Sequence, residues 1–457
     1  MNHISRVLSL LGFCFVISVT TSFARHSPPP VMNQMVEQST GLNIPFLASN
    51  NYALIVAADS LISNTFQPAS PGAAVAVAGK WRGVFIYKPG VEVPFNFEIA
   101  GKEGQPKVYL INGEERFDAG SLRVIGDSVI VPLDQFDNEL AFKTGINTME
   151  GVFRRQDKTG TAIPVVAQKG VSYRFKTSTK TPTADISGTY DVVFPRKDTK
   201  NDSAVGLFKQ VGNRVSATIL RVTGDSRYLD GVIDGNRFYL SSFIGSSPSY
   251  YTGIVSADGK IQGESVGLKA AQPFVAFANE SASLPDAYSL TFLKTGYRKF
   301  DFSFPTPDGK RLSPGDDKYK NKVLIVTIGG TWCPNCMDEA NFLAPWYKAN
   351  KNRGVEVIAI HYERQDDPAF VNKVLTRFKT KFDIQYDIVF GGLSDKQAVA
   401  ASLPSLNNFL SFPTTIFIDK QGNVAKIHTG FTGPATGKFY DQFKADFNAE
   451  VDELLGK

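Results

Sequence analysis

The sequence predicts a multidomain α+β protein in which an all-β N-terminal region precedes a C-terminal α/β domain. From Lys80 to about Ala278, short β-type runs alternate with turn signals, and after Pro285 strands begin to alternate with helices. At 457 residues the chain is too long for one ordinary core. Its composition, 42% hydrophobic and 20% charged, is that of a folded protein.

The charge distribution argues against nucleic acid as a partner. The formal net charge of +5 is spread thinly along the chain. No run of Lys and Arg forms the basic stripe that phosphate binding requires.

The first 24 residues have the pattern of a cleavable signal peptide. Arg6 gives a positive start, residues 7–19 are almost entirely apolar, and Ser22 and Ala24 are small residues at the positions that a signal peptidase reads. The apolar run is shorter than the ~20 residues that a spanning helix needs. We therefore expect export, with an uncleaved membrane anchor as the alternative.

Residues 25–78 are predicted to be a linker or unassigned N-terminal segment. Ser27 to Pro30 indicates a flexible start, and residues 69–78 are rich in Ala, Gly and Pro. A short helix is expected between Asn51 and Ser63.

Two β units are expected, over residues 79–175 and 186–278, joined by the Ser/Thr/Lys/Pro segment Lys176 to Thr183. The first unit begins with the strand-like run Trp81 to Tyr87. It also contains Asn112-Gly113, a hairpin turn signal.

The two β units resemble each other in sequence. Ser187–Phe194 resembles Gly79–Phe85, and Ile233–Leu240 resembles Ile125–Val131. The units are then related, as two sheets of one sandwich or halves of one barrel, unless the likeness is chance among aromatic-rich strands.

The β units show no catalytic constellation. Beyond the signal peptide, the histidines are His26, His361 and His428, and none lies among these strands. A binding or dimerisation module is therefore expected there. Tyr250 and Tyr251 either line a ligand surface or pack across strands.

The C-terminal region alternates buried strands with helices. Val323 to Ile328 is a continuous apolar, β-branched run, as expected of a buried parallel strand. Further strands are expected over residues 355–360, 386–390, 414–418 and 424–428, and helices from the cysteines to about 351 and over 368–382, 396–402 and 439–455.

Cysteine usage indicates redox chemistry. The three cysteines are Cys14, inside the signal peptide, and the Cys-X-X-Cys pair Cys333 and Cys336. A disulfide-stapled fold would show more of them, and a zinc site would need a second pair or nearby histidines. Haem attachment would need a histidine where Met337 stands, so neither a metal nor a cofactor is expected.

The pair lies just past a buried strand and opens a helix. The helix N-terminus favours an anion, so the thiolate of Cys333 should be stabilised. Pro334 takes the first helical position, where its missing N–H costs nothing. Cys336 follows one turn later. Cys333 can therefore attack a disulfide, and Cys336 can resolve the mixed disulfide.

Trp332-Cys333-Pro334-Asn335-Cys336 after a buried strand, with Phe412-Pro413-Thr414 before a later one, resembles the thioredoxin superfamily. The TlpA and ResA type of exported disulfide reductase is the most similar branch. The resemblance covers residues 286–457, a thioredoxin-like domain, and includes the lead-in hairpin at 304–310.

The resemblance implies a role for each motif residue. Cys333 would be the nucleophile and Cys336 the resolving thiol. Pro413 would be a cis-proline facing the pair, and Phe412 would bind an extended substrate segment through its main chain. Trp332 would shield the disulfide. Without the cysteines, a trans proline opening an edge strand would be the preferred interpretation.

Glu339 matches a carboxylate that tunes cysteine pKa values in the ResA type. The alternative is an exposed acid in the first turns of a helix, favoured there by the dipole. Thr327 stands where thioredoxins carry a buried Asp, and Gly329-Gly330 replaces a bulkier pair.

The sequence thus predicts a periplasmic reductase that takes electrons from a membrane donor and reduces disulfides in exported proteins. An oxidase or isomerase would use the same residues, because direction depends on the reduction potential. A second alternative is an envelope ligand-binding protein whose β module carries the main role.

Overall fold

The computed structural model describes residues 77–102, 105–178, 181–196 and 201–456. The predicted signal peptide, the Asn51–Ser63 helix and nearly all of the N-terminal linker lie outside the described residues. No helix in the described ranges is long and apolar enough to cross a bilayer.

The first β unit is one antiparallel sheet in which almost every strand pairs with its neighbour in the chain. The strand order is β4-β3-β2-β1-β9-β8-β7-β6-β5, so the first strand pairs with the last. The strands are β1 Gly79–Lys88, β2 Val91–Lys102, β3 Gln105–Asn112, β4 Glu115–Ser121, β5 Arg123–Ile125, β6 Ser128–Leu133, β7 Asn138–Thr144, β8 Thr148–Arg155 and β9 Ile163–Lys169.

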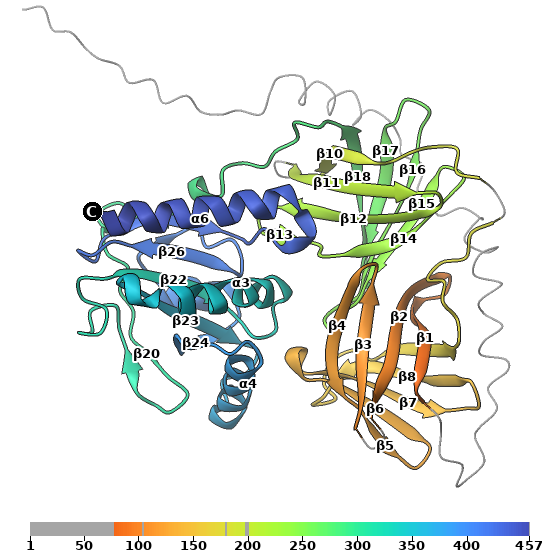
Figure 1. The fold of residues 1–457 in the computed structure, drawn as a ribbon, viewed down its shortest axis with the longest axis horizontal. Helices are drawn as coiled ribbons and strands as arrows, with labels where there is room; N and C mark the ends of the chain where they lie inside the picture. The colour runs from red at the N-terminus through yellow and green to blue at the C-terminus, as the bar shows by residue number, and fades with distance from the viewer. Residues whose placement is uncertain (1–76, 103–104, 179–180, 197–200, 457) are drawn as a thin grey trace, which may run out of the picture. The chain divides into compact units, whose positions relative to one another are not determined.

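The second β unit has the same plan and closes completely, because β11 pairs with β12 as well as with β10. Each unit forms a barrel-like sheet of its own (Figure 1, orange and green), so the two units are neither the two sheets of one sandwich nor the halves of one barrel. The strands are β10 Gly188–Phe194, β11 Asp202–Val211, β12 Arg214–Arg221, β13 Gly224–Asp225, β14 Leu229–Asp234, β15 Arg237–Ser242, β16 Ser249–Val255, β17 Ile261–Val266 and β18 Ala271–Ala278.

The sequence repeat falls on equivalent places in the two sheets. β1 and β10 are the first strands of their units. The turns at Gly126 and Gly235 have φ of 62° and 63°, and each leads into the last four strands of its sheet. This correspondence favours repetition over chance.

Aromatic side chains fill the first sheet. Phe85 is fully buried, stacks on Phe95 with ring centroids 4.5 Å apart, and meets the edge of Phe153 at 5.5 Å. Phe95 lies opposite Gly83, where any Cβ would fall 2.3 Å from the Phe95 ring. The glycine therefore makes room for the ring that supports Phe85.

The tyrosines of β16 belong to the packing as well. Tyr250 and Tyr251 are 4% and 8% exposed. Tyr251 lies opposite Leu240 on β15. The structure therefore supports cross-strand packing, and the ligand-surface interpretation was wrong.

The C-terminal domain is a five-stranded mixed sheet with helices on both faces, in the order β24-β23-β22-β26-β27. The central strand β22 pairs parallel to β23 and antiparallel to β26. The elements are β22 Val323–Gly329, α3 Pro334–Asn350, β23 Val355–Glu363, α4 Pro368–Lys381, β24 Asp387–Leu393, α5 Lys396–Ser402, β26 Thr414–Ile418, β27 Val424–Thr429 and α6 Lys438–Gly456.

Each face of this sheet has its own hydrophobic core. Val323 and Ile325 face α3, α4 and α6, and Figure 1 shows α3 and α6 lying along the sheet. Leu324 and Val326 face α5 and the lead-in segment, with Phe300 fully buried among them. The lead-in includes the expected hairpin, and the short pairs are β19 Phe292–Leu293 with β25 Leu406–Asn407, and β20 Phe304–Pro305 with β21 Arg311–Leu312.

One strand boundary differs from the sequence prediction in a way that matters for the site. The expected strand ended at Ile360, where the apolar run stops, but β23 continues to Glu363. His361 and Glu363 are polar yet only 3% and 1% exposed. A prediction from hydrophobicity alone therefore ends this strand three residues too early.

Removing the aromatic support of the first sheet should destabilise it strongly. Phe85→Ala leaves a cavity between Phe95 and Phe153, so we expect a loss of about 3–5 kcal/mol in the free energy of unfolding. Ile125→Ala, at a side chain 64% exposed, should change it by less than about 0.5 kcal/mol. Urea unfolding of both variants, followed by circular dichroism, tests this; equal effects would contradict it.

Candidate active site

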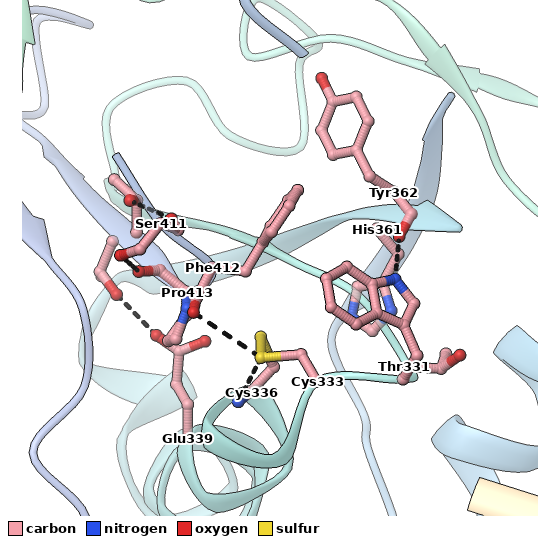
Figure 2. The surroundings of a disulfide bond; sticks show 12 residues. Thr331, Cys333, Cys336, Glu339, His361, Tyr362, Ser411, Phe412 and Pro413 are labelled. Atoms are coloured by element: carbon pink, nitrogen blue, oxygen red, sulfur yellow. Dashed lines mark hydrogen bonds between the residues drawn. A yellow bond between two sulfur atoms is a disulfide. The ribbon is translucent and has the colours of Figure 1, made fainter. Parts of the chain in front are cut away.

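Cys333 and Cys336 form a disulfide where β22 gives way to α3 (Figure 2). Their Cα atoms lie 5.2 Å apart, and the residues are 5% and 3% exposed. Cys333 is the N-cap of α3, and its Sγ accepts a hydrogen bond from the main-chain N–H of Cys336 at 3.2 Å. Pro334 opens the helix, as expected. A thiolate at Cys333 would face this N–H and the positive end of the helix dipole.

The turn before β26, the neighbour of β22 on the side away from β23, faces the disulfide. The Phe412–Pro413 peptide is cis, as the resemblance implied, and Figure 2 shows both residues beside the sulfur atoms. The carbonyl oxygen of Phe412 lies 3.7 Å from Cys333 Sγ. The carbonyl of Pro413 accepts a hydrogen bond at 2.9 Å from the N–H of Gly430, the residue that follows β27.

Trp332 is held from two directions. Its Nε1 donates to the main-chain carbonyl of Tyr362 at 2.9 Å, and its ring meets that of Phe412 edge-on, with centroids 5.4 Å apart. The indole therefore joins the end of β23 to the cis-proline turn. This position suits the shielding role that the resemblance implies.

Of the two glycines before the motif, only Gly330 is required for steric reasons. A Cβ at Gly330 would lie 2.6 Å from both the Tyr362 carbonyl oxygen and Trp332 Nε1. One at Gly329 would lie 3.4 Å from Cys336 Sγ, an almost ordinary contact. The loop thus passes so close to β23 that only glycine fits at position 330.

Glu339 is buried, so the exposed-acid alternative was wrong. It is 6% exposed, and its Oε1 accepts a hydrogen bond from Thr415 Oγ1 at 2.7 Å. Burial raises the pKa of Glu339 to about 7, and the bond from Thr415 opposes that rise. Thr415 lies opposite Thr327, the position at which thioredoxins carry a buried Asp. At this place in the domain the buried carboxyl therefore comes from Glu339 on α3 and not from β22.

Sequence reasoning missed Thr331 and Glu363. The Thr331 main-chain N–H donates to Glu363 Oε1 at 2.9 Å, and Thr331 Oγ1 donates to Oε2 at 2.8 Å. The sequence did contain a signal for this pair of residues. Parallel neighbours such as β22 and β23 end at the same edge of a sheet. An acid just past the apolar run of β23 is therefore placed near the loop that follows β22.

Metal ligation has no candidate site in the part of the chain that the structure describes. No group of three or more His, Cys, Asp or Glu side chains there is placed to hold an ion.

A family model described as Redoxin matches residues 294–441. The thiol-disulfide oxidoreductase ResA of Geobacillus thermodenitrificans is 32% identical over 141 residues, which are 31% of this chain and 72% of that protein. Through its C-terminal domain the chain belongs to the ResA-like thiol-disulfide oxidoreductases of the thioredoxin superfamily.

A ResA from a second organism and one solved structure are also similar to part of this chain. ResA of Bacillus subtilis is 28% identical over 130 residues, 28% of this chain and 64% of that protein, so the chain spans less than two thirds of that relative. A thioredoxin-family thiol:disulfide interchange protein from Chlorobium tepidum is 24% identical, covering 35% of this chain and 95% of that one, with a TM-score of 0.27.

The tight passage of the loop can be tested with two glycines. Gly330→Ala should cost about 1–3 kcal/mol, because the Trp332 indole or the main chain of Tyr362 has to move. Gly329→Ala is the matched control and should cost less. Thermal unfolding of the oxidised full chain compares them, and a larger loss for the Gly329 variant would contradict the steric account.

The burial of Glu339 makes stability depend on pH. Its folded pKa of about 7 lies above the ordinary value of 4.5, so the stability of the wild type falls as pH rises from about 4.5 through 7. Glu339→Gln lacks this ionisation. We expect the variant to gain on the order of 2 kcal/mol relative to wild type between pH 5 and pH 8. Urea unfolding at the two pH values measures the gain; a difference that does not change with pH would refute it.

Proposed function

We propose that this protein is an exported thiol-disulfide oxidoreductase that reduces disulfides in other exported proteins, in the periplasm. The observation that carries the proposal is the placement of Cys333 at the N-cap of α3, 3.7 Å from the Phe412 carbonyl oxygen. A nucleophilic sulfur and a main-chain docking turn thereby lie next to each other.

The reaction begins with the reduced pair. The Cys333 thiolate attacks one sulfur of the substrate disulfide, an S–S bond forms between protein and substrate, and the other substrate sulfur leaves as a thiolate. The Cys336 thiolate then attacks Cys333 Sγ and releases the second substrate sulfur. The substrate gains two electrons and two protons, and the protein is left with the internal disulfide.

Glu339 is placed to take part in the proton transfers. It follows Cys336 by three residues on α3 and therefore lies on the same helix face. With a pKa of about 7, its carboxyl group can both accept and release a proton near neutral pH. We assign it the role of accepting the proton of the Cys336 thiol before the resolving attack.

The cis-proline turn supplies the docking site. We assign Phe412 the task of hydrogen bonding, through its main chain, to an extended substrate segment next to Cys333. Trp332 and the ring of Phe412 would cover the mixed disulfide.

Export and electron supply complete the proposal. The signal-like residues 1–24 support export. Each turnover consumes the dithiol, so a donor of two electrons is required, and we propose one held in the membrane. The β units would then serve binding or dimerisation, since their sequences contain no catalytic constellation.

Two cysteine variants distinguish the roles of the sulfurs. Cys336→Ser should accumulate a mixed disulfide with substrate, because Cys333 can still attack but nothing resolves the product. Cys333→Ser should form none and should lose insulin-reducing activity. Non-reducing electrophoresis and mass spectrometry of the trapped species test this assignment. Equal trapping by both variants would contradict the assignment of attack to Cys333 and resolution to Cys336.

The direction of transfer is set by the reduction potential. We expect a value near that of thioredoxin, roughly −270 mV, for the Cys333–Cys336 pair. Equilibration of the full-length protein with glutathione or dithiothreitol buffers measures it. A value near the oxidising limit of about −120 mV would instead favour disulfide formation.

A further inference from the structure

Glu363 is an almost fully buried acid at the end of β23, outside the motif residues. It is 1% exposed, and its side chain turns toward the loop that carries the cysteines. Burying a carboxylate is costly unless donors satisfy it. The donors here come from Thr331, two residues before Cys333.

The hydrogen bonds fit an ionised carboxylate. Oε1 accepts from the Thr331 N–H and Oε2 accepts from its hydroxyl, so both oxygens act as acceptors. His361 Nδ1 is 3.6 Å from Oε1, beyond hydrogen-bond distance, and finds no hydrogen-bond partner among the described residues. The adjacent Arg364 places its guanidinium over the Trp332 ring, 5.5 Å from the centroid.

The end of β23 thereby holds both residues that precede Cys333. Glu363 binds Thr331, and the Tyr362 carbonyl binds the Trp332 indole. Two residues of chain span at most about 7 Å, and with the Thr331 hydrogen bond and the cysteine side chain added, the carboxylate lies within roughly 14 Å of the reactive sulfur. The same side chain therefore fixes the loop and places a negative charge beside it.

We propose that Glu363 is a positioning residue that fixes the redox loop and, through its negative charge, keeps the Cys333–Cys336 pair reducing. Reduction creates a thiolate at Cys333, and a nearby buried carboxylate disfavours that second negative charge. The oxidised form carries no such charge, so the equilibrium shifts toward the disulfide. The inference rests on the proposed redox function of the pair.

The test replaces Glu363 in the full-length protein and measures the equilibrium constant with glutathione. Glu363→Gln keeps an acceptor for the Thr331 N–H and a donor for its hydroxyl while removing the charge. We expect the equilibrium to shift about tenfold toward the dithiol, a rise of about 30 mV. Glu363→Asn also removes the charge and should shift the equilibrium in the same direction, so the test survives poor folding of the glutamine variant.

Two further variants separate charge from packing. Glu363→Asp keeps the charge on a shorter side chain and should stay within threefold of wild type. Glu356→Gln is the matched control, because Glu356 is a buried acid that binds Tyr347 and Lys322 at the opposite end of β23. Its equilibrium constant should stay within twofold of wild type.

The outcomes are distinct. If the neutral variants stay within twofold of wild type, or if the aspartate variant shifts as far as asparagine, Glu363 has no electrostatic role and the inference fails. If the wild-type pair itself cannot be cycled by glutathione or dithiothreitol, the proposed function fails instead.

Discussion

The parallel pairing of β22 with β23 is the constraint on which the active site depends. Because the two strands run in the same direction, their carboxyl ends reach the same edge of the sheet, with Gly329 opposite His361. The chain then leaves β22 through Gly330 and Thr331 to begin α3. The Tyr362 carbonyl and the Glu363 carboxylate at this edge therefore bind the loop that carries Cys333. The antiparallel strand β26 brings the cis-proline turn to the same edge from the other side.

Two buried carboxyl groups lie close to the redox pair and differ in their surroundings. Glu339 accepts one hydrogen bond from a hydroxyl, and burial dominates, so its pKa rises to about 7. Glu363 accepts from a main-chain N–H and a hydroxyl at once. One acid is thus suited to exchanging protons, whereas the other holds the redox loop through both of its oxygens.

The chemistry of this protein is readable from its sequence where residue identity and spacing alone decide the outcome. Cys333, Cys336 and Pro334 are such residues, because a Cys-X-X-Cys pair at a helix N-terminus leaves few alternatives. The cis form of the Phe412–Pro413 peptide followed only from the family resemblance. The apolar runs located most strands of the C-terminal domain to within a few residues. Helix α5 and strand β26 match their predicted ranges.

What the sequence did not reveal depends on contacts between distant segments. The burial of Glu339 follows from the docking of α3 against β26, which no local pattern describes. The last residues of β23 are polar because they bind a loop, so a hydrophobic criterion ends the strand early. Closure of the second sheet requires β10 to meet β18, more than 70 residues further along the chain.

The position of the disulfide in the sequence also determines how much the stability of the fold depends on the redox state. Only one other cysteine exists in the chain, Cys14 near the N-terminus. The loop closed by Cys333 and Cys336 has only two residues between the cysteines and constrains little of the unfolded chain, so the fold gains little stability from the disulfide. The cores of the two β sheets and of the C-terminal domain are held by apolar packing, which does not change when the disulfide is reduced. Reduction of the Cys333–Cys336 disulfide therefore breaks no crosslink on which the fold depends.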